Sequence, residues 1–367
     1  MSRADLARRA ALAPSTVSAV VSDLQAAGLV VEPAEPVHPA ERGTVGRPPV
    51  LIALHRKAGV VAGIDFGKRH LRLAISDLSH SLLAERHRAL DADLPAKDAI
   101  AMATEVFADA LEEAEVARDE VVGVGLGLPG PVHRPSGELG NSTILPGWAG
   151  TRAAEAVADA LALPVEVEND ANLGALGEWM WGAGHGAAHM AYVKASTGIG
   201  AGFIVANAPY VGAGGTAGEL GHTVVDPGGP ICRCGNRGCL ENFAGAPAIL
   251  SSLRDVHGDG FTLQEAVALA VRGDLGCQRA IADAGAAIGT AVATLCNLFN
   301  PHRVVVGGDL GVAGEVLLGP LRESLVRGAI RSAVEDVSIV QGELGDRAEV
   351  LGAVALVLGR GAEATTA

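Results

Sequence analysis

The stretch CRCGNRGC places three of the chain's five cysteines within eight residues, as Cys232, Cys234 and Cys239. His222 lies ten residues before the first of them. Three thiolates and one imidazole make a tetrahedral zinc set without an open position, which is usual for a structural zinc site. Reduced loop thiols and a redox pair are the alternatives, but clustered cysteines in a cytoplasmic protein favour a metal over a disulfide. The spacing therefore predicts structural zinc.

Polar residues suited to a sugar lie beside this cluster and in the stretch EVENDAN. Glu219 precedes the histidine by three residues, Glu241 follows the last cysteine by two, and Asn169 and Asp170 end a predicted strand. Carboxylate, amide and imidazole groups match the donors and acceptors of vicinal hydroxyls. An aspartate at a strand end in a cleft can also act as a general base toward a hydroxyl. Taken singly, each residue is more often a solvated surface group, and Asp170 has the alternative role of capping the next helix.

Two glycine-rich turns have the composition of phosphate-binding loops. One is Thr197-Gly198-Ile199-Gly200-Ala201-Gly202, and the other contains Asp65-Phe66-Gly67. Backbone N–H groups in such turns can bind an anion. Tight β-hairpins use the same residues, so each turn alone is a weak indication of a nucleotide.

The elements that must position these residues follow a repeated pattern. Residues 60–78 read strand, glycine turn, strand, and residues 190–207 repeat that order. Further strands are predicted at 121–130, 164–170 and 303–311, and helices at 96–117, 153–162 and 349–364. Two copies of one unit, each followed by helices, predict a duplicated α/β fold with a cleft between two lobes. The remaining cysteines, Cys277 and Cys296, fall in helical patterns and are expected to be buried.

Residues 1–50 have a different pattern. A short helix at 3–10, a turn, and a second helix capped by Ser15 and stopped at Gly28 come first. Strands at 29–31 and 50–55 then flank a proline-rich loop that ends in GRPP. This order predicts an α+β winged helix-turn-helix that lacks the usual first helix.

In that domain, Ser15, Thr16 and Ser18 would face the major groove of DNA, and Arg47 would enter a minor groove. The second helix carries no basic residue. A small dimerisation or capping segment is therefore the alternative.

Composition limits the remaining possibilities. A chain of 367 residues is expected to form two or three units. Its net charge of −14 argues against binding nucleic acid or acidic lipid through bulk charge, so any DNA contact must be local. The sequence shows no membrane span and no signal peptide, which predicts a cytoplasmic protein without membrane partners.

Together these residues resemble the ROK family of repressors and sugar kinases over nearly the whole chain. GELGH followed by CRCGNRGCLE is similar to the family's ExGH and CxCGxxGCxE signatures. ENDAN and STGIGAG resemble its NDA motif and second phosphate loop, and NPHRVVVGGDL resembles its adenosine-side strand. The N-terminal segment and GRPP resemble the family's repressor branch.

The resemblance implies an actin-like, hexokinase-type fold. The expected domains are a winged helix-turn-helix and linker at 1–50, a first lobe at 58–176 joined by a closing helix at 346–365, and a second lobe at 177–345. It also implies that zinc fixes the loop that places two of the sugar ligands. The matching positions would bind zinc (His222, Cys232, Cys234, Cys239), sugar (Asn169, Asp170, Glu219, His222, Glu241) and, in degenerate form, nucleotide (Asp65, Gly67, Thr197, Gly198, Gly200, Gly307, Gly308).

One loop departs from the family's kinase pattern, in which an acidic residue is followed by x-G-G-T. Here Asp65-Phe66-Gly67 is followed by Lys68 and Arg69, so two bulky side chains replace a glycine and a threonine. Phosphoryl transfer depends on precise positioning of the phosphates, and the altered loop has lost the residues that would provide it. The altered loop therefore favours a sugar-responsive transcriptional regulator, of the repressor type, over a kinase. Such a regulator is expected to form a homodimer or homotetramer on operator DNA. The alternative is an ATP-dependent hexose or N-acetylhexosamine kinase that uses Mg-ATP, with Asp170 as base. The sequence does not name the sugar.

Overall fold

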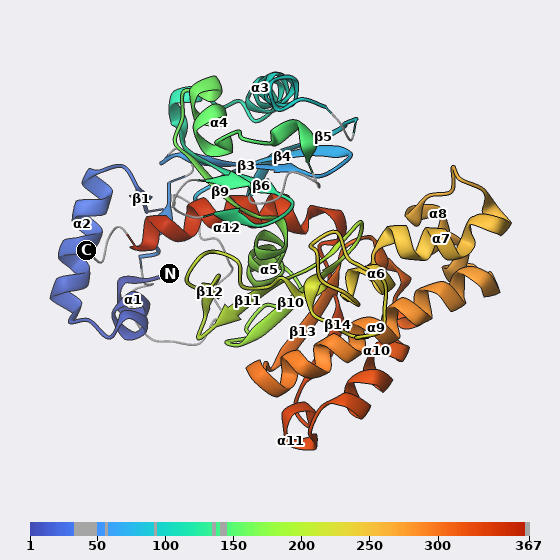
Figure 1. Cartoon of the computed structure of the whole chain (residues 1–367). Coiled ribbons are helices and arrows are strands. Elements are labelled where there is room, and N and C mark those ends of the chain that lie inside the picture. The colour runs from blue at the N-terminus through green and yellow to red at the C-terminus, as the bar shows by residue number, and fades with distance from the viewer. Residues whose placement is uncertain (33–49, 56–57, 92–93, 134–136, 140–144, 364–367) are drawn as a thin grey trace.

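The computed structural model describes residues 1–32, 50–55, 58–91, 94–133, 137–139 and 145–363. Within these ranges it is a mixed α/β structure with two five-stranded sheets and a small N-terminal segment (Figure 1). Arg47 and the GRPP stretch lie outside the described residues.

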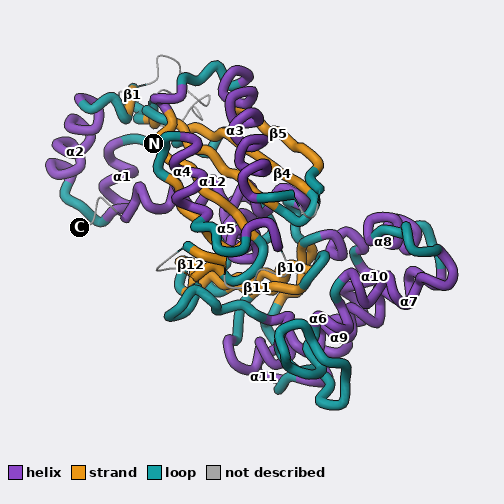
Figure 2. Tube along the Cα trace, turned by 45° about the horizontal axis from the view of Figure 1, so that its top comes forward, coloured by secondary structure: helices purple, strands orange, loops and turns teal. Residues whose placement is uncertain are grey.

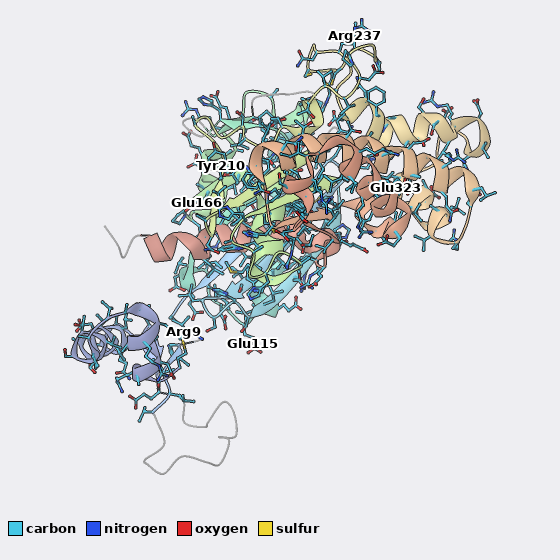
Figure 3. The ribbon with its side chains drawn as sticks, turned by 90° about the horizontal axis from the view of Figure 1, so that it is seen from below. Arg9, Glu115, Glu166, Tyr210, Arg237 and Glu323 are labelled. Carbon is cyan, nitrogen blue, oxygen red and sulfur yellow. The ribbon has the colours of Figure 1, made fainter. Side chains whose placement is uncertain are left out.

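The N-terminal segment has the predicted order of two helices and two strands. Helices α1 (Arg3–Ala10) and α2 (Pro14–Ala26) are followed by strands β1 (Val30–Val31) and β2 (Ala53–Leu54), which pair antiparallel. The segment has a small core of its own, made by Ala7, Val17, Val21 and Ile52. Seen from below, it stands apart from the body of the molecule (Figure 3).

The predicted capping role of Ser15 is wrong. Helix α2 begins one residue earlier, at Pro14, and the N-cap position is occupied by Ala13. Proline suits the first helical position because its fixed φ is helical and its missing N–H would have no partner there. Ser15 therefore lies inside the first turn, and its side chain is exposed.

The first large sheet consists, in spatial order, of β5 (Leu82–Ala89), β4 (His70–Asp77), β3 (Val60–Phe66), β6 (Val121–Leu128) and β9 (Val165–Asn169). Strands β3 and β4 form an antiparallel hairpin, whereas β6 and β9 add in parallel. Helices α3 (Ala96–Glu113) and α4 (Ala153–Leu161) cover one face, and α12 (Ala348–Glu363) covers the other (Figure 1). A short ribbon, β7 (Val132–His133) and β8 (Glu138–Leu139), lies between β6 and α4 in the chain.

The second large sheet repeats this pattern with β12 (Ala208–Tyr210), β11 (Ile199–Val205), β10 (Met190–Ala195), β13 (Arg303–Gly307) and β14 (Ser338–Gln341). Strands β10 and β11 form the hairpin, and β13 and β14 add in parallel. The predicted repeat of strand, turn and strand is confirmed.

The remaining helices belong mostly to this half of the molecule. Helix α9 (Leu275–Phe299) lies in its core and packs against α10 (Glu315–Gly328). The others are α6 (Glu241–Ala244), α7 (Ala246–His257), α8 (Leu263–Val271), α11 (Arg331–Val334) and the short 3₁₀ turns Arg118–Glu120, Pro146–Trp148, Leu220–His222, Asp309–Ala313 and Gly345–Arg347. Helices α7 and α8 project at one end (Figure 2).

A pair of helices joins the two sheets. Helix α5 (Asp170–Trp181) packs on β10 and β11, α12 packs on β3, β4 and β6, and the two helices pack against each other. The approach is close, because a Cβ atom at Gly352 of α12 would overlap the backbone of Leu173 in α5. The predicted boundary between 176 and 177 falls inside α5, and the domain boundaries stay a prediction.

Among the described residues, α9 is also long and apolar enough to suit a membrane span by length and composition. Of the apolar 18-residue window in this helix, 56% is buried inside the protein, as in the core helices of soluble proteins, so this is weak evidence for a span.

Candidate sugar pocket and metal centre

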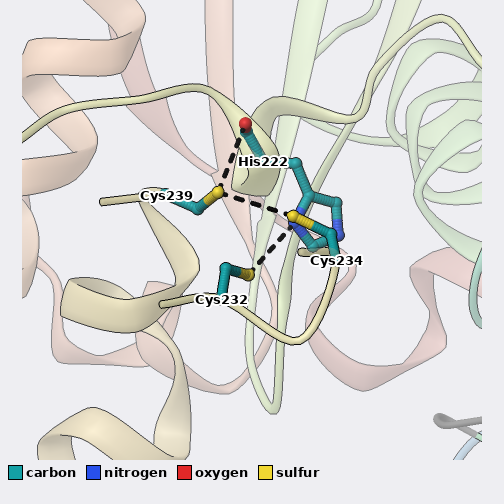
Figure 4. A group of neighbouring side chains, drawn as sticks. All are labelled: His222, Cys232, Cys234 and Cys239. Carbon is teal, nitrogen blue, oxygen red and sulfur yellow. Dashed lines mark hydrogen bonds between the residues drawn. The ribbon is translucent and has the colours of Figure 1, made fainter. Parts of the chain in front are cut away.

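The four predicted metal ligands come together (Figure 4). His222 ends a 3₁₀ turn after β12, and the three cysteines lie in the loop before α6. Their ligand atoms all lie within 4.8 Å of one another. The Nδ1 atom of His222 is 3.6 Å from Cys232 Sγ, and the sulfurs of Cys234 and Cys239 are also 3.6 Å apart.

These separations suit a tetrahedral ion. Zn–S bonds of about 2.3 Å and Zn–N bonds of about 2.0–2.1 Å place the ligand atoms about 3.5–3.8 Å apart along the edges of a tetrahedron. Cys232 and Cys239 are buried and Cys234 is exposed, so one side of the site is open to solvent. The donor set and the geometry therefore fit zinc. Cys277 and Cys296 are buried in α9, as predicted.

The second ring nitrogen of His222 lies on the side of Glu219, one of the predicted sugar ligands. Its Nε2 atom lies 3.9 Å from Glu219 Oε2. Burial raises the pKa of the Glu219 carboxyl; His222 opposes the shift, and the carboxylates of Asp170 and Glu241 add to it. These electrostatic effects show that the loop residues and Asp170 share one neighbourhood. Metal on Nδ1 and a hydroxyl on Nε2 are compatible roles for one imidazole.

Asn169, rather than Asp170, is the N-cap of α5. Its Oδ1 accepts hydrogen bonds from the N–H groups of Ala171 at 2.9 Å and Asn172 at 3.2 Å. Its Nδ2 donates to the carbonyl of Gly130. The Oδ1 atom of Asp170 accepts a second bond from Ala171, which leaves Oδ2 for other partners.

The partner of Asp170 Oδ2 is Lys194, a residue that the sequence did not single out. Its Nζ atom lies 2.9 Å from Asp170 Oδ2 and 3.1 Å from Glu349 Oε1, at the start of α12. Burial alone would lower the pKa of Lys194, but the carboxylates of Asp170 and Glu349 raise it well above its ordinary value. The proposed base is therefore already paired with a fixed positive charge.

The first glycine turn is filled by a side chain. His70 Nε2 lies 2.8 Å from Asp65 Oδ2, and Asp65 is 1% exposed. A Cβ atom at Gly67 would overlap the His70 ring, so the imidazole covers the backbone of this turn. The Gly67 N–H donates to the His70 carbonyl, which closes a tight hairpin over Lys68 and Arg69. The space above this turn is thus occupied by protein.

The second glycine turn is packed against Glu241. A Cβ atom at Gly198 would lie 2.5 Å from a carboxylate oxygen of Glu241, and Ile199 N–H donates to that oxygen at 3.3 Å. Arg233, between the first two cysteines, binds the same carboxylate through two nitrogens at 2.8 and 3.1 Å. Thr197 is exposed at the tip of the turn.

The other predicted nucleotide glycines also have protein neighbours. Gly200 faces Ala171, Gly307 faces the ring of Tyr192, and Gly308 has a φ of +76° against the backbone of Ala195. Hairpin and packing geometry account for these glycines without a nucleotide. Their nucleotide role stays a prediction.

Three further site residues, Lys194, Arg233 and His70, were not predicted, because their sequence contexts are only weak signals. Lys194 is a single cation in an apolar strand, Arg233 lies within the cysteine motif, and His70 follows the altered loop. Nothing local in the sequence connects Glu349 to Lys194, because the two are brought together only by the packing of α12 against the rest of the fold.

The predicted DNA-contacting residues of α2 are exposed. Ser15, Thr16 and Ser18 lie in the first two turns, and Ser18 Oγ donates to the carbonyl of Pro14. Arg8 and Arg9, at the end of α1, are exposed nearby in the chain and supply positive charge that α2 lacks.

Comparison with known proteins gives a consistent result. The ROK family matches residues 61–360. A xylose repressor from Caldicellulosiruptor bescii is 30% identical over 371 residues, covering 98% of this chain and 92% of the relative. A glucokinase from Thermotoga maritima is 35% identical over 256 residues, covering 65% of this chain and 80% of the relative.

A solved structure shows the same fold. The crystal structure of a ROK family transcriptional regulator, a homologue of the Escherichia coli Mlc protein, superposes with a TM-score of 0.80 at 25% identity and covers 98% of this chain and 92% of its own. The predicted actin-like, two-lobe fold is confirmed. With a family match over most of its length, a relative at 30% identity and this shared fold, the chain belongs to the ROK family.

Proposed function

We propose that the chain is a sugar-responsive transcriptional repressor that binds a hexose or amino sugar in the pocket between its lobes. The observation that carries this proposal is the N-terminal segment, in which two helices and a two-stranded wing fold on their own core. A sugar kinase has no need of such a segment. The similarity to a xylose repressor covers 98% of this chain and therefore includes the N-terminal segment.

The sugar ligands would be Asn169, Asp170, Glu219, His222 and Glu241. Zinc bound by His222, Cys232, Cys234 and Cys239 would supply no redox or acid–base chemistry. These residues would instead hold the loop that carries His222 and Glu241 at the pocket. Arg233 supports this assignment, because it links the cysteine loop directly to Glu241.

Operator DNA would be the macromolecular partner. Ser15, Thr16 and Ser18 would face the major groove and Arg47 a minor groove, in a cytoplasmic homodimer or homotetramer. Sugar binding would change lobe closure and shift the N-terminal segments relative to the operator. The ligand can supply only its difference in affinity for the two states.

A sugar kinase is the second candidate, supported by the similarity to a glucokinase and by Asp170 at the start of α5. It would require Mg-ATP. Two contacts oppose kinase activity. The ion pair with Lys194 occupies the carboxylate of Asp170, which would have to accept the proton of the sugar hydroxyl. The ring of His70 covers the first glycine turn, where the phosphates would bind.

The test is incubation of the zinc-loaded protein with Mg-ATP and D-xylose, D-glucose, N-acetyl-D-glucosamine or N-acetyl-D-mannosamine. ADP formation is followed, and sugar binding is measured by calorimetry. We expect binding of at least one sugar without turnover. Asp170→Asn is the control, because it should weaken binding in either case and abolish any true turnover.

Sugar-dependent ADP formation well above background, lost in Asp170→Asn, would overturn the repressor-only proposal. DNA binding is then tested by selecting duplexes from a random pool with the full chain. Release of the selected duplex by the bound sugar is the expected result, and a protein that selects no duplex would contradict the proposal.

A further inference from the structure

A buried ionic cluster connects the proposed sugar pocket to α12. The ammonium of Lys194, on β10, contacts Asp170 at the start of α5 and Glu349 in the first turn of α12. Tyr192, two residues before Lys194 on the same strand, directs its hydroxyl to the same oxygen of Glu349 at 3.5 Å. Three elements thus share one cation.

The cluster is shielded from water, and its carboxyl groups outnumber its single ammonium group. The side chains of Lys194, Asp170 and Glu349 are 16%, 15% and 7% exposed. Asp65 acts on the same ammonium as a third carboxylate, and one of its oxygens is buried without a hydrogen-bond partner. Because interactions between charges strengthen when water is excluded, a change at one carboxylate is felt by the others.

We propose that Lys194 transmits occupancy of the sugar pocket to α12 through Glu349. This inference rests on the proposed role of Asp170 as a sugar ligand. A sugar hydroxyl that donates to Asp170 Oδ2 competes with Lys194 for that acceptor, since both bind the same oxygen. The ammonium then interacts more strongly with Glu349, which belongs to the helix that covers the first sheet.

A shift of α12 would affect both halves of the molecule, because of where this helix packs. Helix α12 lies on the first sheet and against α5, which lies on the second, so a shift of its first turn changes how the halves meet. In Figures 1 and 2 its C-terminal end lies on the same side of the molecule as α1 and α2. Sugar at one end of the helix would therefore affect an element whose other end lies on the side of the proposed DNA-reading segment.

The decisive variant is Glu349→Gln, which keeps the shape and an acceptor oxygen but removes the charge, and which does not touch the sugar ligands. Glu315→Gln is the matched control, because Glu315 is also a first-turn glutamate, on α10, and pairs with Arg322 at the surface. Sugar affinity is measured by calorimetry with D-xylose, D-glucose and N-acetyl-D-glucosamine. The response of α12 is measured as the change in amide hydrogen exchange of residues 348–359 on adding the sugar that binds.

In the wild type and Glu315→Gln, we expect sugar to change exchange in the first turns of α12. In Glu349→Gln, we expect most of this exchange response to be lost while sugar binding remains measurable. An unchanged response in Glu349→Gln would overturn the inference while leaving sugar binding intact. Failure of the wild type to bind any of the sugars would instead overturn the proposed function, and the inference with it.

A second measurement uses no sugar. The stabilities of Lys194→Met, Glu349→Gln and the double variant are compared by urea unfolding. We expect the double variant to be clearly less destabilised than the sum of the single changes. Strict additivity would show that the ammonium and Glu349 are not coupled and would overturn the proposed path.

Discussion

Arg233 binds Glu241 through two nitrogens, at 2.8 and 3.1 Å, although the arginine lies in the cysteine loop and the glutamate is the first residue of α6. The arginine stands between two proposed metal ligands, and the glutamate is a proposed sugar ligand. A fork-shaped guanidinium fixes a carboxylate in orientation as well as in position. The metal loop therefore contacts the proposed pocket through a side chain as well as through the backbone.

Arg233→Ala is expected to weaken sugar binding about fivefold, an effect of about 1 kcal/mol for a partly exposed pair, because Glu241 loses its fixed orientation. Arg233→Lys should fall between the two, since it keeps the charge but loses the fork. Calorimetric titration with the sugar that binds the wild type measures the effect. Tighter binding by Arg233→Ala would mean that the arginine occupies the place of the ligand.

Metal removal is expected to free the thiols of the cysteine loop and abolish sugar binding. The purified protein should contain one zinc per chain, and Cys234→Ser should lose it. Burial raises the pKa of Cys277 and of Cys296 to about 11, so at pH 8 only about one thiol in a thousand at these positions is ionised. A thiol reagent after chelation should therefore react with the loop cysteines, first at the exposed Cys234, and not at Cys277 or Cys296 while the fold persists. Full sugar affinity after metal removal would contradict the supporting role of the loop.

The stability of the wild type should fall relative to that of Glu349→Gln as pH rises above 4.5 toward the raised pKa of Glu349. Burial raises the pKa of Glu349 above its ordinary value of 4.5, although Lys194 opposes the shift, while the carboxylates of Asp65 and Asp170 add to it. Above pH 4.5 the unfolded chain releases this proton while the folded protein still holds it, so folding becomes less favourable up to the raised pKa. The glutamine variant lacks this step.

Thermal unfolding of the two proteins at several pH values measures the difference. Its sign is the prediction. A gap that closes or reverses as pH rises would show that Lys194, rather than burial, dominates the titration of Glu349.

Val21→Asp should abolish DNA binding and leave sugar affinity within about twofold of wild type. Val21 is 3% exposed in the small core of the N-terminal segment, and an unpaired charge there is costly enough to unfold so small a core. Val256→Asp is the matched control, because Val256 is 80% exposed on α7, outside the N-terminal segment. Fluorescence anisotropy with a selected duplex, beside calorimetry, gives both readouts. Loss of sugar binding in Val21→Asp would show that the segment and the body fold together.

The sequence was informative where chemistry is local. The three loop cysteines and His222 lie within 18 residues, so their spacing alone constrained them to one site. The strand–turn–strand repeat was also predictable, because hydrophobic strands flank glycine turns in both copies. By contrast, the helix start at Pro14 was missed because a serine in the first turn has the same composition as an N-cap.

The ionic cluster could not have been predicted in this way. Lys194 and Glu349 come from elements far apart in the chain, and their pairing depends on how α12 packs between the sheets. His70 could have been suspected, since it follows the altered loop, but only the fold shows that its ring covers Gly67. Long-range packing thus determined the contacts that pair Asp170 and cover Gly67.

The N-terminal segment, with its own core and its place apart from the body, also makes the chain modular. In Figure 3 it lies at the opposite end of the molecule from Arg237 of the cysteine loop. A chimaera in which this segment is exchanged for that of another regulator would recognise a new promoter while responding to the same sugar. Such an exchange would turn the sugar-binding body into an interchangeable input for synthetic gene circuits.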